Sequence, residues 1–212
     1  MRLEDLLRTL AEDERGASYN LKRQLALAVA SGLLAASFLV LTLAGSRPDW
    51  GSAIFAHDVL TKVGAAFLLV GSSFLALREA VQPTPISRQM LALLWAAPLL
   101  LLIAAAAELL TSPPNVWLSA LMGTHPELCV VMVPLLSMPS MVAVFYVMRN
   151  GAARSPARAG ALAGLLCGAL GASAYMLRCT DDAPLFVITW YATAVIIVSG
   201  LGAVLGHRLL RW

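Results

Sequence analysis

Six long apolar stretches, nearly free of charged residues, constrain this chain more than any other feature of its sequence. A helix of roughly 20 apolar residues crosses the hydrocarbon core of a bilayer, and each stretch is about that long. Only 13% of the residues are charged and 59% are hydrophobic, which leaves too little polar surface for a water-soluble domain. We therefore expect an all-α polytopic membrane protein, a bundle of six transmembrane helices. The stretches run from Leu25 to Ala44, Val59 to Leu77, Gln89 to Ala107, Leu128 to Met148, Ala159 to Leu177 and Pro184 to Gly206.

The first two stretches have competing interpretations. A cleaved signal peptide would begin with a compact positive region, but acidic residues precede the first stretch, so we expect a retained span. Lys62 interrupts the second stretch near one end, and its long side chain can reach the membrane interface from within a span. The acidic residues before the first stretch are Glu4, Asp5, Glu12, Asp13 and Glu14.

The basic residues indicate on which side of the membrane each loop lies. When the loops are assigned alternately to two sides, 12 of the 15 Lys and Arg residues fall on the side of the termini, and only Arg47, Lys62 and Arg178 fall on the other. Basic residues in short loops stay in the cytoplasm, so we expect both termini to be cytoplasmic. The predicted organisation is a cytoplasmic N-terminal segment (1–24), a transmembrane domain (25–206) and a cytoplasmic tail (207–212).

Several functional classes are disfavoured by what the spans contain. Carriers place ionisable groups in mid-membrane, whereas most candidates here lie at span ends. No HExxH, GxSxG or glycine-rich phosphate loop occurs, so we expect no enzyme, no catalytic residue and no cofactor. The formal charge of +3 comes without a dense basic run, so we expect no direct contact with nucleic acid. A small transporter and a membrane thiol-disulfide oxidoreductase remain as alternatives.

Prolines and small residues inside the spans predict how the helices bend and pack. Pro98, Pro134 and Pro139 are expected to kink the third and fourth spans, where neighbouring helices satisfy the freed carbonyls. In the fifth span a glycine recurs every four residues, which lets helix backbones approach closely, either within the bundle or between the two copies of a homodimer. These glycines are Gly160, Gly164 and Gly168. Cys167, beside the last of them, is expected to be a packed apolar residue.

Two cysteines lie at the outer ends of neighbouring spans. Cys129 begins the fourth span and Cys179 follows the fifth, and the inner loop between these spans is short. The spans are therefore expected to be antiparallel neighbours with the two thiols within bonding reach. Such a pair suits a structural disulfide, a reversible redox switch, or a soft-metal site assisted by His125, Glu127 and Asp181. The fourth alternative is a pair of inert, buried side chains.

The N-terminal segment carries one apolar stripe. Leu3, Leu6, Leu7 and Leu10 follow helical spacing, so a helix from Arg2 to Ala11 would have one leucine face and one charged face. The stripe suits either the surface of the inner leaflet or a groove in a cytosolic protein. The acidic residues of the segment repel anionic lipid, which favours a protein partner.

Two segments of the sequence resemble a known family. His125-Pro-Glu-Leu-Cys129 and Cys179-Thr-Asp-Asp-Ala-Pro-Leu-Phe, the latter followed by Trp190-Tyr191, are similar to the two cysteine segments of the NrsF-type bacterial membrane proteins. These proteins are negative regulators of sigma-F, a sigma factor of the extracytoplasmic-function (ECF) class. The similarity extends over the whole chain, although only these two segments are specific.

The resemblance implies an anti-sigma factor. The N-terminal segment would hold the ECF sigma factor inactive at the membrane, with the leucine stripe as part of the contact. Cys129 and Cys179 would be sensor positions that release the sigma factor under oxidative or heavy-metal stress. Such a mechanism needs two states of the bundle that differ in affinity for the sigma factor.

Overall fold

The computed structural model describes the backbone of residues 3–53, 55–82, 85–151 and 153–210, and the side chains of these residues except 3–19, 50 and 52. Every regular element within these ranges is helical. Six helical segments are long and apolar enough to cross a membrane, as the sequence predicts, with bounds that differ from the expected ones by up to 14 residues. They are Asn20–Leu43, His57–Ala80, Arg88–Thr111, Pro114–Met148, Pro156–Tyr175 and Pro184–Leu209.

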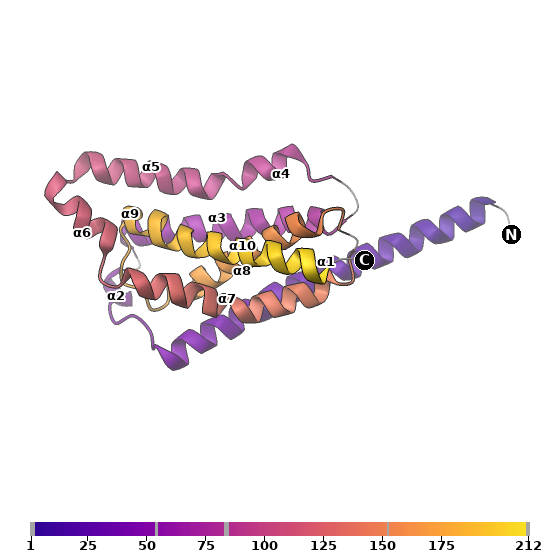
Figure 1. Ribbon diagram of the computed structural model, residues 1–212, viewed down its shortest axis with the longest axis horizontal. Coiled ribbons are helices and arrows are strands. Elements are labelled where there is room, and N and C mark those ends of the chain that lie inside the picture. The colour runs from indigo at the N-terminus through magenta and orange to yellow at the C-terminus, as the bar shows by residue number, and fades with distance from the viewer. Residues whose placement is uncertain (1–2, 54, 83–84, 152, 211–212) are drawn as a thin grey trace.

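Helix α1 (Leu3–Leu43) combines the N-terminal segment and the first span in one unbroken helix. Its 41 residues correspond to a length of about 60 Å. The N-terminal part of α1 extends beyond the bundle, and both chain ends lie at the same end of the molecule (Figure 1). The expected boundary at residue 24 therefore falls inside a continuous helix. The side chains of the leucine stripe lie outside the described residues.

Helix α8 (Pro156–Tyr175) forms the centre of the bundle. It packs against α1, α3 (His57–Ala80), α7 (Pro126–Met148) and α10 (Ala192–Leu209). Its sequence is mostly alanine and glycine, whose small side chains let four neighbours approach at once. As a result 14 of its 20 residues are buried.

The glycine stripe of α8 makes an internal contact. A Cβ atom added at Gly164 would lie 2.8 Å from the Cα of Ser199 and 3.1 Å from that of Gly202, both on α10. Gly160 meets Gly202 and Gly206 in the same way, and Gly168 lies against Val195. Of the two uses that the stripe predicts, the structure shows packing between α8 and α10.

The third span is broken into α4 (Arg88–Leu93) and α5 (Ala96–Thr111), as Figure 1 shows. The break lies just before Pro98, whose ring clashes with the carbonyl four residues earlier, so the predicted kink is confirmed here. In contrast, α7 continues as one helix through Pro134 and Pro139. The short elements α2 (Trp50–Ala53), η1 (Pro114–Val116) and α6 (Trp117–Met122) lie at the end opposite the termini, where α9 (Pro184–Phe186) begins the last span.

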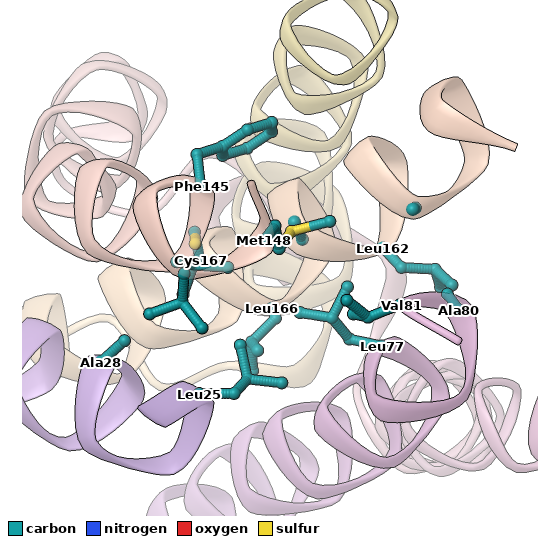
Figure 2. Close-up of a cluster of buried hydrophobic side chains, with 14 of the residues drawn as sticks. Leu25, Ala28, Leu77, Ala80, Val81, Phe145, Met148, Leu162, Leu166 and Cys167 are labelled. Atoms are coloured by element: carbon teal, nitrogen blue, oxygen red, sulfur yellow. The ribbon is translucent and has the colours of Figure 1, made fainter. Parts of the chain in front are cut away.

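Two hydrophobic clusters fill the bundle, one in each half. The cluster nearer the termini, which we call the terminal cluster, joins side chains of α1, α3, α7 and α8 (Figure 2). Cys167 is fully buried there, which confirms its expected role as a packed apolar residue. The second cluster surrounds Cys129 and Cys179 in the other half. The terminal cluster includes Leu25, Ala28, Leu77, Ala80, Val81, Phe145, Met148, Leu162, Leu166 and Cys167.

Candidate functional site

Cys129 lies in the first turn of α7. The preceding His125 and the N-terminal proline, Pro126, start this helix, because proline at the first helical position needs no intrahelical hydrogen bond. Glu127 adds a carboxylate at the positive end of the helix dipole. Cys129 itself faces the bundle and is fully buried.

Cys179 reaches the same place from the opposite direction. Helix α8 ends at Tyr175, and the backbone N–H of Cys179 donates to the carbonyl of Tyr175 at 3.0 Å to close the final turn. Because α7 and α8 are antiparallel neighbours, the end of α8 meets the start of α7. The thiol of Cys129 is hydrogen-bonded to the sulfur of Cys179, so the structure brings the two cysteines together. Both are free thiols.

A buried lysine lies beside the thiol pair. The side chain of Lys62, from α3, is only 2% exposed. Its Nζ donates to the backbone carbonyl of Asp181 at 2.9 Å and to Oδ1 of Asp182 at 3.1 Å, and lies 4.9 Å from the ring centre of Tyr191. The side chain of Lys62 therefore points into the bundle, toward the loop that carries Cys179. A carboxylate and a carbonyl inside the bundle compensate the ammonium that would otherwise be costly to bury.

A buried arginine ties a second segment to the same loop. Arg47 follows α1 and is 4% exposed. Its guanidinium contacts Oδ2 of Asp182 at 2.9 Å and Oδ1 of Asp49 at 2.7 Å, and donates to the carbonyl of Cys179 at 3.4 Å. The hydrogen bond from Arg47 lowers the pKa of Asp49 from its ordinary 3.8 to about 2. The loop after α1 is thereby held against the loop that carries Cys179.

The surroundings of Cys179 favour its thiolate. The hydrogen bond with Cys129 has the largest effect and the ammonium of Lys62 adds to it, and together they outweigh burial, so the pKa of Cys179 falls to about 6. The thiolate, which is the nucleophilic form of cysteine, is therefore favoured at Cys179 relative to an isolated thiol. We use the name thiol site for Cys129, Cys179, Lys62, Arg47, Asp182 and Tyr191.

Tyr191 completes the thiol site from a distorted turn. It ends the π-helical segment η2 (Val187–Tyr191), a form of turn that is common at functional positions. Its ring lies 6.1 Å from that of Tyr175 and 6.3 Å from that of Phe186. Its buried hydroxyl has no hydrogen-bond partner among the described residues while Cys179 is a thiol, and it lies close enough to the sulfur to stabilise a thiolate.

The three residues expected to assist a soft metal do not join the cysteines. His125 pairs with Glu127 at 3.2 Å, and both side chains are about two-thirds exposed. The carboxylate of Asp181 instead accepts hydrogen bonds from the backbone N–H and the hydroxyl of Thr124. In the part of the chain that the structure describes, no three His, Cys, Asp or Glu side chains converge as metal ligands. The expected metal-assisting arrangement is therefore not formed.

The sequence interpretation did not assign a role to four members of the thiol site, Arg47, Lys62, Asp182 and Tyr191. Arg47 and Tyr191 carry no spacing that marks them, since their partners are far away in the chain. Lys62 carried a signal, because an ionisable residue inside an apolar span is a functional candidate by default.

The family model described as "Negative regulator of sigma F" (NrsF) matches residues 10–212. A "Probable anti-sigma-F factor NrsF" from Azospira oryzae is 30% identical over 213 residues, covering 100% of both chains. An "Anti-sigma-F factor NrsF" from Caulobacter vibrioides is 30% identical over 217 residues, again covering 100% of both chains. No solved structure matches the chain.

Proposed function

The chain belongs to the NrsF family of negative regulators of sigma F, and from this premise we propose that it holds an ECF sigma factor inactive at the bacterial inner membrane and releases it when the thiol pair is modified. As a member of this family it is a regulator and not an enzyme, and its partner is a sigma factor. The observation that supports sensing is the thiol site, where a low-pKa thiolate contacts a second thiol.

Hydrogen peroxide is the simplest oxidant for this chemistry. The thiolate of Cys179 attacks one peroxide oxygen and becomes a sulfenic acid, and the other oxygen leaves as hydroxide, which takes up one proton to become water. The sulfur of Cys129 then attacks the sulfenic acid, forming a disulfide and releasing a second molecule of water. Two thiols are thus oxidised by two electrons and one peroxide is reduced.

A soft metal ion is the second proposed signal. Two adjacent sulfurs bind Cd²⁺ or a similar ion as thiolates and release protons when they do so. Water or the ion's own counter-ligands would complete its coordination.

The proposed orientation places the thiol site in the periplasm and the N-terminal segment in the cytosol. It is supported by the distribution of basic residues, 12 of 15 of which lie on the side of the termini. The proposed contact with the sigma factor is the leucine stripe at Leu3, Leu6, Leu7 and Leu10. A helical stripe of this kind suits an apolar groove on a protein partner.

The sensor role is tested with three single variants. Cys129→Ser and Cys179→Ser are expected to abolish the peroxide-dependent release of sigma F from purified membranes, because neither variant can form the disulfide. Cys167→Ser is the matched control, since Cys167 lies in the terminal cluster, and it should release sigma F like the parent. Normal release in both Cys129→Ser and Cys179→Ser would reject the sensor role.

The sigma contact is tested in the N-terminal segment. Leu6→Asp and Leu7→Asp place a charge on the stripe and are expected to abolish co-purification of sigma F with membranes. Thr9→Asp places the same charge off the stripe and is the control. Undiminished co-purification with both leucine variants would reject the contact.

A further inference from the structure

The geometry points to Arg47 as the positioning residue that couples the state of the thiol pair to α1. This inference rests on the proposed function, because α1 continues into the segment proposed to hold the sigma factor. It names the connection through which a change at Cys179 reaches the other end of the molecule. The connection consists of the loop after α1, the loop after α8 and the ion pairs between them.

Arg47 makes three contacts with the loop that carries Cys179. Its backbone N–H donates to the carbonyl of Leu177 at 2.9 Å. Its Nη1 donates to the carbonyl of Cys179 at 3.4 Å, and its Nη2 contacts Oδ2 of Asp182 at 2.9 Å. These contacts span the residues on both sides of the reactive sulfur. Any displacement of the Cys179 backbone therefore acts on Arg47 directly.

Asp182 connects Arg47 to Lys62. One carboxylate receives both the guanidinium of Arg47 and the ammonium of Lys62, and the side chains of the two cations are 3% and 2% exposed. Buried charge pairs keep their geometry because separating them leaves an uncompensated charge in a low dielectric. When Cys179 changes from a thiolate to a disulfide sulfur, one negative charge next to Lys62 disappears. The ammonium of Lys62 then has one anion fewer beside it. Its interaction with Asp182 changes in strength, and so does the interaction of Asp182 with Arg47.

The other end of the connection is a rigid helix. Arg47 follows the last residue of α1, Leu43, by four positions, and α1 has no break back to Leu3. Helix α1 approaches α7 closely at Gly32, where an added Cβ would lie 2.7 Å from the Cα of Ser140. This crossing is nearer to Arg47 than to the leucine stripe in the chain. A tilt of α1 about the crossing is therefore larger at the stripe than at Arg47.

The test separates the chemistry of the thiols from the response of the partner. The full chain is purified with bound sigma F, treated with hydrogen peroxide, and assayed for disulfide formation by a maleimide gel shift and for sigma F retained. The parent should retain at least about fivefold more sigma F when reduced than when oxidised, the lower range of allosteric coupling. In Arg47→Gln this ratio should fall to about one while the half-time of disulfide formation stays within about twofold of the parent.

Two further variants exclude a general structural defect. Arg178→Gln removes an exposed arginine from the same loop and should behave like the parent. Arg47→Lys keeps a cation facing Asp182 and should restore part of the ratio, which a folding defect at this position would not do. An unchanged ratio in Arg47→Gln overturns the inference, and so does a ratio lost together with disulfide formation. If the parent itself shows a ratio of one, the proposed function fails instead.

Discussion

In the half of the bundle near the termini, Cys167 packs among aliphatic and aromatic side chains, whereas in the other half Cys179 lies beside a buried lysine and a second thiol. Both cysteines are buried, with exposures of 0% and 6%. The difference between them is the charge placed next to the sulfur, because burial alone disfavours a thiolate and a nearby cation favours it. Reactivity in this bundle is therefore set by Lys62 and Cys129 and not by access alone.

The two halves also differ in what they contribute to stability. The terminal cluster buries only apolar side chains, which is the dominant favourable term in folding. The thiol site buries two cations and a carboxylate, and such ion pairs recover their desolvation cost only with good geometry. An apolar core would be at least as stable there, so the charges are best explained by function. Three variants test this difference between the terminal cluster and the thiol site.

The largest effect is expected from Leu166→Ala in the terminal cluster. Leu166 is fully buried, and removing its side chain leaves a cavity that costs about 2 to 5 kcal/mol of unfolding free energy. Thermal unfolding in detergent, followed by tryptophan fluorescence, should show a clearly lower midpoint. Leu110→Ala, at a side chain that is 87% exposed, is the control and should change little in detergent. A changed pH profile for alkylation of Cys179 in Leu166→Ala would contradict the assignment of its low pKa to its immediate neighbours.

An intermediate effect is expected from Lys62→Met. In the parent, the rate of alkylation of Cys179 should rise with pH through about 6 and level off above, because the thiolate is the reactive form. Without the ammonium, the pKa of Cys179 moves up toward its ordinary value of 9.0, and alkylation at pH 6 should slow about fivefold. Mass spectrometry after timed exposure to iodoacetamide measures the rate, with Cys167 as an unreactive internal reference. Lys22→Met removes a lysine in the terminal half and should leave the profile unchanged; an unshifted profile in Lys62→Met would refute the assignment.

The smallest effect is expected from Tyr191→Phe. The variant removes only a buried hydroxyl that stabilises the thiolate of Cys179, so alkylation at pH 6 should slow about twofold. Thermal stability should not fall, because the hydroxyl has no hydrogen-bond partner among the described residues in the thiol state. Tyr146→Phe, at a ring that is 72% exposed, is the control. Slower alkylation in both variants, or in neither, would show that the hydroxyl of Tyr191 does not stabilise the thiolate of Cys179.

Much of the fold follows from local patterns in the sequence. The six spans are visible as apolar runs, the break before Pro98 follows from the chemistry of proline, and the meeting of Cys129 with Cys179 follows from a short loop between adjacent helices. The continuity of α1 was missed because the change from polar to apolar residues near Gln24 looks like a boundary, although no proline interrupts the helix there.

The charged part of the thiol site was not predictable in the same way. Arg47 and Lys62 meet Asp182 across 135 and 120 residues of sequence, and such contacts leave no periodic pattern. Which carboxylate pairs with which cation depends on how two loops and one helix pack together. For a related reason, His125, Glu127 and Asp181, which the sequence predicted to assist a metal, do not lie with the two sulfurs among the described residues. Nearness to a cysteine in the sequence does not show that a side chain points toward the sulfur.

The unbroken helix α1 also fixes a rotational phase between its two ends. Each residue of an α-helix turns the chain by about 100°, so one residue inserted between positions 11 and 20 would swing the leucine stripe by that angle around the helix axis. An insertion of seven residues, close to two full turns, would return the stripe nearly to its original azimuth while moving it about 10 Å farther from the bundle. The number of residues between the stripe and the bundle therefore sets the direction in which the stripe faces as well as its distance from the bundle.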